Sequence, residues 1–182
     1  MANVVAFLRA INLAGARIVR MSSLRQLFES LGFSDVETFI ASGNVVFRAR
    51  TKRTKVLERK IEKNLREAFG FEVEVFVRTA AELAAIEDYD PFAEAKVNAL
   101  TARNIVFLKD TLDQKLKKKV EALKTDTDKF RVRGREIYWL RRRRGEGVPF
   151  STVPLQKILD RLFTIRAFNT ISRMVERYFS AD

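Results

Sequence analysis

The order in which apolar periodicities follow one another constrains the fold most strongly. In the first half, short apolar stretches of strand length, the last of them with two-residue alternation, take turns with stretches of helical spacing. We expect strands at 4–8, 36–41, 45–48 and 72–77, and helices at 24–31 and 57–69. The order strand, helix, strand, strand, helix, strand is that of the ferredoxin-like unit, an antiparallel sheet with two helices on one face. We therefore predict the strand order 4-1-3-2.

Local signals set the ends of these elements. The spacing of Ser23 and Gln26 is typical of a capping box, and Thr79 with Glu82 forms a second one. Gly70 can end the second helix, because glycine readily takes the left-handed conformation found at helix ends. The tripeptide 42–44 predicts a turn between the second and third strands.

The second half begins the same pattern again. We expect a strand at 104–108, a helix at 112–123, a hairpin that turns near Gly134 and a helix at 154–163. A last helix, with apolar residues at helical spacing from Phe168, takes the place of a fourth strand. The predicted order is β-α-β-β-α-α, and its likeness to the first half is consistent with an internal duplication.

These patterns predict an α+β fold in three parts. Residues 1–78 form a ferredoxin-like half, residues 79–101 a helical connector, and residues 102–182 a related half with a basic hairpin and terminal helices. The organisation leaves open whether the two halves arose by duplication.

Composition excludes several kinds of chemistry. The 182 residues include no Cys and no His, which excludes thiolate nucleophiles, imidazole bases and the usual zinc sites. We expect no metal, and the sequence leaves the cofactor unknown. The absence of Cys fits a reducing compartment. The apolar run at 4–8 is too short for a membrane span or a signal peptide, so we expect a cytoplasmic protein without a membrane partner.

A run of arginines near the middle of the second half gives the first candidate site. The net charge is +12, and residues 130–144 hold seven arginines against the single carboxylate of Glu136. Arginines bind phosphates and aromatic rings stack on bases. The candidate nucleic-acid-binding residues are Arg131, Arg133, Arg135, Trp139, Arg141, Arg142, Arg143 and Arg144.

Two alternative interpretations of this segment remain open. Runs of charge usually face water and keep a protein soluble. Neighbouring residues of a strand also point to opposite faces, so one of Tyr138 and Trp139 is expected in the core.

Topology indicates a second candidate site at one edge of the first sheet. In a β-α-β-β unit the end of the first strand and the turn between the next two strands lie at the same edge. A guanidinium, two amides and a turn could there bind a carboxylate or phosphate. The alternative is a tight turn without a ligand. The candidate residues are Arg9, Asn12, Ser42, Gly43 and Asn44.

Arg166 and Asn169, near the start of the last helix, form a third polar pair. They serve either as ligand contacts or as an anchor where the chain enters the helix.

Three stretches resemble the domain of unknown function 1697 family. They are LRAINLAGARIVRMSSLRQLFESLGFSDVETFIASGNVVF, FEVEVFVRTAAELAAI and TIRAFNTISRMVE. Members of that family begin with a sequence like LRGINVGG, continue to SGNVVF and carry a TARNWNTVLKLAE segment. The resemblance implies an α+β fold of ferredoxin-like character and no particular reaction.

The sequence departs from the family pattern at five positions: Ala10, Ala14, Thr152, Ala167 and Phe168. The family has glycines at the first two, a lysine at the third, and Asn-Trp at the last two. If that lysine or asparagine contacts a ligand in relatives, the site is altered here.

The sequence is compatible with three classes of function. The favoured hypothesis is a non-enzymatic binding module for an anionic partner, nucleic acid first, because ferredoxin-like sheets and arginine-aromatic strands suit bases and phosphates. The alternatives are a small-molecule enzyme or ligand-binding protein that uses the Arg9 edge, and an interaction protein that pairs through sheet edges. The sequence indicates neither an oligomeric state nor whether the protein is an enzyme.

Overall fold

The computed structural model describes residues 1–12, 17–40, 43–92, 101–142 and 151–179. Arg143, Arg144, Ser42 and Ala14 lie outside these ranges. The chain divides into two compact units, Met1–Ile86 with Arg173–Asp182, and Glu87–Ser172. None of the helices in the described ranges is both long and apolar enough to cross a membrane.

The first half contains a four-stranded antiparallel sheet. Its elements are β1 (Ala2–Leu8), α1 (Met21–Ser30), β2 (Ser34–Thr38), β3 (Asn44–Ala49), α2 (Thr54–Phe69), β4 (Val75–Thr79) and α3 (Ala80–Asp88). The strands lie in the order β2-β3-β1-β4. This confirms the predicted order 4-1-3-2, with the first and third strands in the centre.

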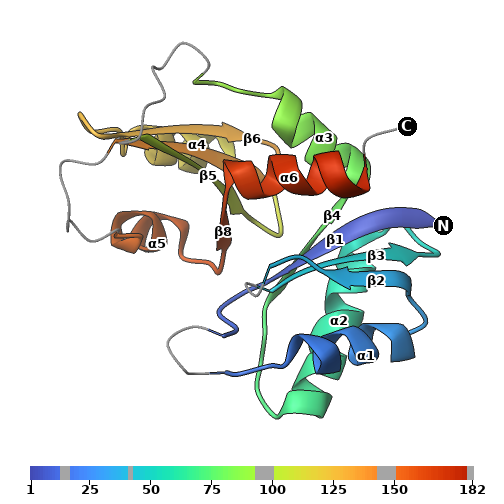
Figure 1. Cartoon of the computed structure of the whole chain (residues 1–182). Helices are drawn as coiled ribbons and strands as arrows, with labels where there is room; N and C mark the ends of the chain where they lie inside the picture. Colours follow the sequence, from blue (N-terminus) through green and yellow to red (C-terminus); the bar gives the residue numbers. More distant parts are fainter. Residues whose placement is uncertain (13–16, 41–42, 93–100, 143–150, 180–182) are drawn as a thin grey trace. The chain divides into compact units, whose positions relative to one another are not determined.

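One face of this sheet packs against helices α1 and α2 (Figure 1). Alternate residues of β1, such as Val4 and Ala6, share a core with Leu24 and Phe28 of α1 and with Ile61 of α2. The prediction that α1 and α2 cover the same face is therefore confirmed. Because strand side chains alternate, the remaining residues of β1 point to the other face, where Phe7 is also buried.

The helix ends follow the predicted signals in part. Gly70 takes the left-handed conformation and ends α2, and Thr79 and Glu82 form the predicted capping box at the start of α3. The prediction of a capping box at Ser23 is wrong. Helix α1 begins at Met21, its N-cap is Arg20, and no side chain caps it.

The second half repeats the element order of the first. Its elements are β5 (Thr101–Phe107), α4 (Gln114–Glu121), β6 (Asp128–Arg133), β7 (Glu136–Arg142), α5 (Val153–Leu159), β8 (Thr164–Ala167) and α6 (Phe168–Tyr178). The strands lie in the order β6-β7-β5-β8, the same order as in the first sheet. The two halves are thus similar, as a duplicated unit would be.

The predicted β-α-β-β-α-α order lacks the fourth strand, β8, and is corrected by the structure. Strand β8 is only four residues long and runs directly into α6, so no turn residue separates the strand pattern from the helix pattern. Strand β8 pairs antiparallel with β5.

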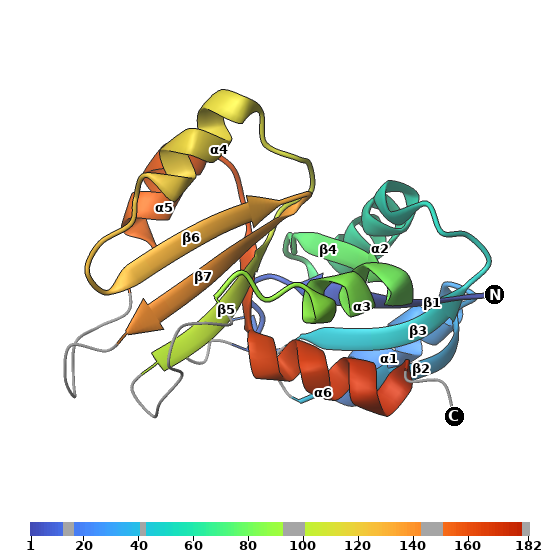
Figure 2. The same cartoon turned by 90° about the horizontal axis from the view of Figure 1, so that it is seen from above.

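Helices α4 and α5 pack on one face of the second sheet (Figure 2). Val120 of α4 and Leu155 of α5 share a core with Val106, Phe130 and Trp139 of the sheet. The opposite face carries the alternate residues of the same strands. Because successive strand residues point to opposite faces, the arginines of the β6–β7 hairpin are divided between the two faces of the sheet.

Candidate functional site

Strand β6 presents a row of cations. Its burial alternates: Phe130 and Val132 are buried, whereas Lys129, Arg131 and Arg133 are exposed. The alternation arises because the apolar residues pack against the helices and their neighbours must then face the other side. β6 is also an outer strand of its sheet, so this row lies along an edge.

The cations of this row contact rings and backbone. The Cζ atom of Arg133 lies 4.5 Å from the ring centroid of Tyr89, and that ring meets the Tyr138 ring edge-on at 4.9 Å. Arg131 donates to the carbonyl oxygen of Phe130 at 3.1 Å. Within the described ranges, Lys129, Arg131 and Arg133 form no ion pair with a carboxylate. Their charge is therefore not neutralised by a paired carboxylate there.

The other predicted arginines of the hairpin are placed differently. Arg142 is exposed at the end of β7, and its backbone nitrogen donates to the carbonyl of Thr127 at 2.7 Å. Arg135 and Arg141 are half-buried, and Arg135 donates to the carbonyl of Lys109 at 3.4 Å. The structure thus brings Arg131, Arg133 and Arg142 to the sheet face opposite α4 and α5.

Trp139 has the contacts of a core residue. It is 4% exposed, its Nε1 atom donates to Oδ1 of Asp128 at 2.8 Å, and its ring centroid lies 5.0 Å from that of Phe130. Tyr138 is 3% exposed, so both residues are buried where strand alternation predicted one. Burial raises the pKa of Tyr138, with a smaller contribution from the Glu136 carboxylate. Base stacking by Trp139 stays a prediction.

The two asparagines of the predicted edge site bind backbone. Both amide atoms of Asn12 engage Val19: Nδ2 donates to its carbonyl at 3.0 Å, and Oδ1 accepts from its nitrogen at 2.7 Å. Asn44 is fully buried, and its Nδ2 donates to the carbonyl of Phe39 at 3.0 Å. These bonds close two loops and support the tight-turn interpretation.

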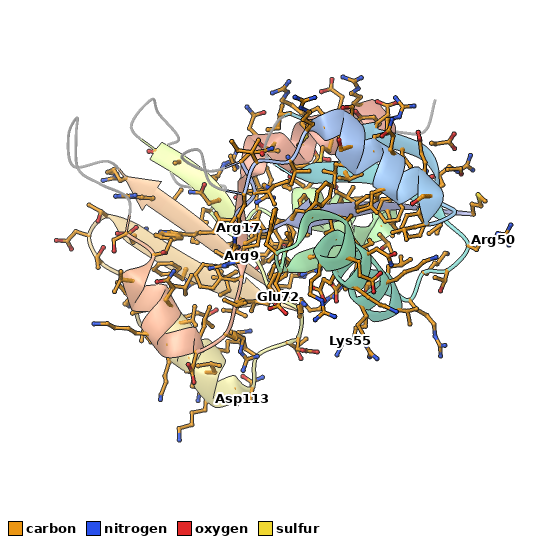
Figure 3. All side chains as sticks on the ribbon, turned by 90° about the horizontal axis from the view of Figure 1, so that it is seen from below. Arg9, Arg17, Arg50, Lys55, Glu72 and Asp113 are labelled. Atoms are coloured by element: carbon orange, nitrogen blue, oxygen red, sulfur yellow. The ribbon has the colours of Figure 1, made fainter. Side chains whose placement is uncertain are left out.

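Gly43 and Arg9 complete this edge as far as the structure describes it. Gly43 has a φ of +75°, and its carbonyl accepts from the nitrogen of Leu8 at 2.7 Å. The backbone nitrogen of Arg9 donates to the carbonyl of Glu74 at 2.9 Å, and Figure 3 labels the Arg9 side chain. The structure brings the end of β1 to this turn, as topology predicts. Ligand binding there stays a prediction.

Arg166 lies on β8 and is held by its neighbours. One terminal nitrogen donates to Oγ1 of Thr164 and to the carbonyl of Ile165, each at 2.8 Å. Burial lowers the pKa of Arg166 to about 10, which still leaves it charged at neutral pH. Asn169 is exposed in the first turn of α6. These contacts favour a structural role for Arg166.

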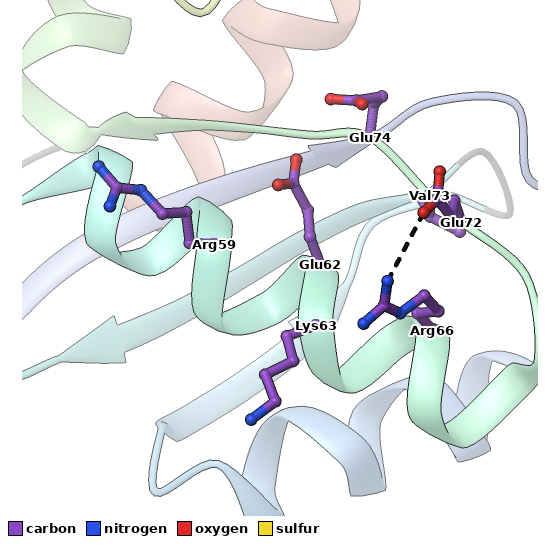
Figure 4. A pocket seen from close by; sticks show the side chains of 7 residues that line it. All are labelled: Arg59, Glu62, Lys63, Arg66, Glu72, Val73 and Glu74. Atoms are coloured by element: carbon purple, nitrogen blue, oxygen red, sulfur yellow. Dashed lines mark ion pairs between the residues drawn. The ribbon is translucent and has the colours of Figure 1, made fainter.

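A hollow of about 270 Å³ lies on the surface of the first unit, between α2 and the segment that leads into β4 (Figure 4). Arg66 and Glu72 form an ion pair of 3.7 Å there, and Glu62 accepts from the nitrogen of Val75 at 2.9 Å. Its three cations face three carboxylates, so it has no net field that selects an ion of either sign. Among the described residues, no group of three acidic side chains could hold a metal ion.

Sequence reasoning missed Lys129 in the cation row of β6 and the contact between Arg133 and Tyr89. Lys129 continues the two-residue spacing of Arg131 and Arg133, and this spacing was a signal that could have found it. Tyr89 lies more than forty residues from Arg133, and no local pattern links them.

Comparison with known proteins assigns the chain to a family. The model of the family described as "Protein of unknown function (DUF1697)" matches residues 1–138. The chain belongs to this family. The predicted membership of DUF1697 is therefore confirmed, and the name of the family supplies no activity.

A solved structure shows the same fold over nearly the whole chain. A conserved bacterial protein from Streptococcus pneumoniae, SP0830, is 23% identical, with a TM-score of 0.70, covering 96% of this chain and 98% of that one. At this identity the likeness establishes the fold of this DUF1697 protein alone. None of the curated proteins compared with the chain matches it.

Proposed function

We propose that this DUF1697 protein binds single-stranded nucleic acid through a basic face, defined as Lys129, Arg131 and Arg133 of β6 with Arg142 of β7. One observation carries the proposal. Three exposed cations stand in a row on one strand, and none is ion-paired within the part of the chain that the structure describes.

The spacing of the row favours a chain of phosphates over a single anion. Alternate residues of a strand are about 6.6 Å apart, so three of them extend over about 13 Å. Charges spread along a line can each neutralise a different phosphate of one strand. The guanidinium groups also bind phosphate oxygens in a bidentate manner, which lysine cannot do.

The buried aromatic residues determine what kind of binding is expected. Tyr138 lies on the same face as Arg131, its partner in the β6–β7 register, but it is buried. The basic face therefore offers phosphate contacts without an exposed stacking ring. Binding should be electrostatic, largely independent of base sequence, and steeply weakened by salt.

The test compares two triple variants of equal charge. K129Q/R131Q/R133Q removes the row, whereas K115Q/K118Q/K119Q removes three exposed cations from α4 in the same unit. Fluorescence anisotropy of a labelled single-stranded RNA is measured against salt concentration. The first variant should lower the salt slope by roughly 0.7 per lost contact, or about 2 in total. The second should leave the slope nearly unchanged.

Two results would contradict the proposal. If both variants weaken binding equally, the interaction depends on the total charge and not on the basic face. If the wild-type chain binds no single-stranded RNA or DNA at low salt, nucleic-acid binding is wrong.

A further inference from the structure

A small cavity lies in the second unit on the helix-covered side of the β6–β7 hairpin. Its volume is about 190 Å³, and its lining comes from the hairpin, from the segment between α4 and β6, and from the start of α5. This volume is below the roughly 300–1,000 Å³ of pockets for drug-sized ligands. The cavity can therefore hold one small ring system.

One wall of the cavity is aromatic. The rings of Phe130 and Trp139 have centroids 5.0 Å apart and planes inclined by 37°. Leu123 and Leu155 add apolar surface beside them. A flat ligand can lie against such a wall, because ring faces gain both apolar burial and favourable ring–ring geometry.

The other wall carries a carboxylate beside a guanidinium. Asp128 and Arg141 are direct partners in the β6–β7 register, and both line the cavity. Their charges compensate, so this end attracts neither anions nor cations strongly. It offers a hydrogen-bond acceptor and donors side by side.

The Asp128 carboxylate is held in place before any ligand arrives. Its Oδ1 accepts from Nε1 of Trp139 at 2.8 Å, and its Oδ2 accepts from Oγ1 of Thr127 at 2.9 Å and from Oγ1 of Thr125 at 3.2 Å. A carboxylate has about four acceptor positions, so one more donor can be accommodated. The acceptor is thus fixed by the protein and still able to bind.

We propose that this cavity binds a neutral planar heteroaromatic ring of nucleobase size. A nucleobase combines a flat apolar face with an edge that carries both donors and acceptors, which matches the aromatic wall and the Asp128–Arg141 pair. The inference does not rest on the proposed function, because the cavity and the basic face lie on opposite sides of the sheet and a nucleoside carries no phosphate.

The single tryptophan of the chain makes the test direct. Trp139 is the only one, so ¹⁵N-labelled protein gives one indole N–H resonance, from the cavity wall itself. The four ribonucleosides are titrated separately, with free ribose as control. At least one nucleoside should shift this resonance saturably, with a dissociation constant of roughly 0.05–5 mM for a base of about ten non-hydrogen atoms. Ribose should cause no shift.

Two arginines of the second unit provide matched variants. Arg141 lines the cavity, whereas Arg161 is exposed and lies outside the lining, so R141Q should weaken nucleoside binding about tenfold or more and R161Q should leave it unchanged. L123F places a larger side chain at the half-buried rim of the cavity and should abolish the shift of the indole resonance. This variant replaces R141Q as the test if R141Q does not fold. The absence of a saturable shift with every nucleoside, or equal weakening in R141Q and R161Q, would overturn the inference.

Discussion

Glu58 of α2 accepts a hydrogen bond of 2.9 Å from the backbone nitrogen of Val77 on β4. β4 is an outer strand, and Glu58 is only 3% exposed, so the helix supplies the acceptor that a neighbouring strand would otherwise provide. We expect Glu58→Ala to lower the free energy of unfolding by about 1–3 kcal/mol, because a buried N–H loses its partner.

Urea unfolding measures the loss of unfolding free energy in Glu58→Ala. The control is Glu67→Ala, on the exposed side of the same helix. That control should change stability by less than about 0.5 kcal/mol. Glu58→Gln keeps an oxygen acceptor and should recover part of the loss. Equal stability of Glu58→Ala and Glu67→Ala would contradict the assigned role.

Two glycines with similar backbone angles provide a second test. Gly43 (φ +75°) and Gly32 (φ +79°) are both left-handed, so alanine is strained at either. A Cβ at Gly43 would lie 2.9 Å from Cγ1 of Ile11, whereas nothing lies within 4 Å at Gly32. Gly43→Ala should therefore destabilise the protein by about 1–3 kcal/mol more than Gly32→Ala. Thermal melts of the two variants check this difference. Equal melting temperatures would contradict the clash between a side chain at position 43 and Ile11.

Substitutions of Trp139 separate packing from stacking. Because the ring is buried against Phe130 and bonded to Asp128, Trp139→Ala should lower the stability by about 3–5 kcal/mol. Trp139→Phe keeps most of the ring but leaves Asp128 without one donor, and should lower it by about 1–3 kcal/mol. Chemical denaturation of both variants gives these values. A Trp139→Ala protein of unchanged stability and reduced RNA affinity would instead favour the stacking role.

The raised pKa of Tyr138 predicts a loss of stability in alkali. The unfolded chain releases the phenolic proton near pH 10, while the folded chain retains it to higher pH because the charged form is desolvated. The stability that Tyr138 contributes is therefore complete below pH 10 and falls as the pH rises above it, by up to about 1.4 kcal/mol per pH unit. Unfolding free energies between pH 9 and 11 should fall less steeply in Tyr138→Phe. An identical pH profile in both proteins would contradict the burial of this hydroxyl.

Most of the first half could be predicted from the sequence because its signals are local. Glycine at position 70, the capping box at Thr79 and the continuous apolar run of β1 each act within a few residues. The strand order then follows from the one topology that buries both helices on one face. Strand β8 escaped prediction because its four residues run straight into a helix.

The candidate sites were harder to predict, because they depend on contacts between distant residues. The bond from Trp139 to Asp128 joins neighbouring strands eleven residues apart, and Asn12 binds Val19 across a loop. No spacing rule distinguishes an asparagine that closes a loop from one that binds a ligand. The row of cations on β6 could be predicted, since strand alternation alone places every second residue on one face.

The position of β6 at the outside of its sheet has a consequence for behaviour at high concentration. An uncovered strand edge is a template on which another molecule can add a strand, and lysine or arginine along the edge opposes such aggregation through charge repulsion. Glu121 already engages the nitrogen of Val132 at 3.0 Å, which removes one donor from that template. Neutralising Lys129, Arg131 and Arg133, by substitution or by a polyanion, would weaken this protection, so colloidal stability should depend on whether the basic face is occupied.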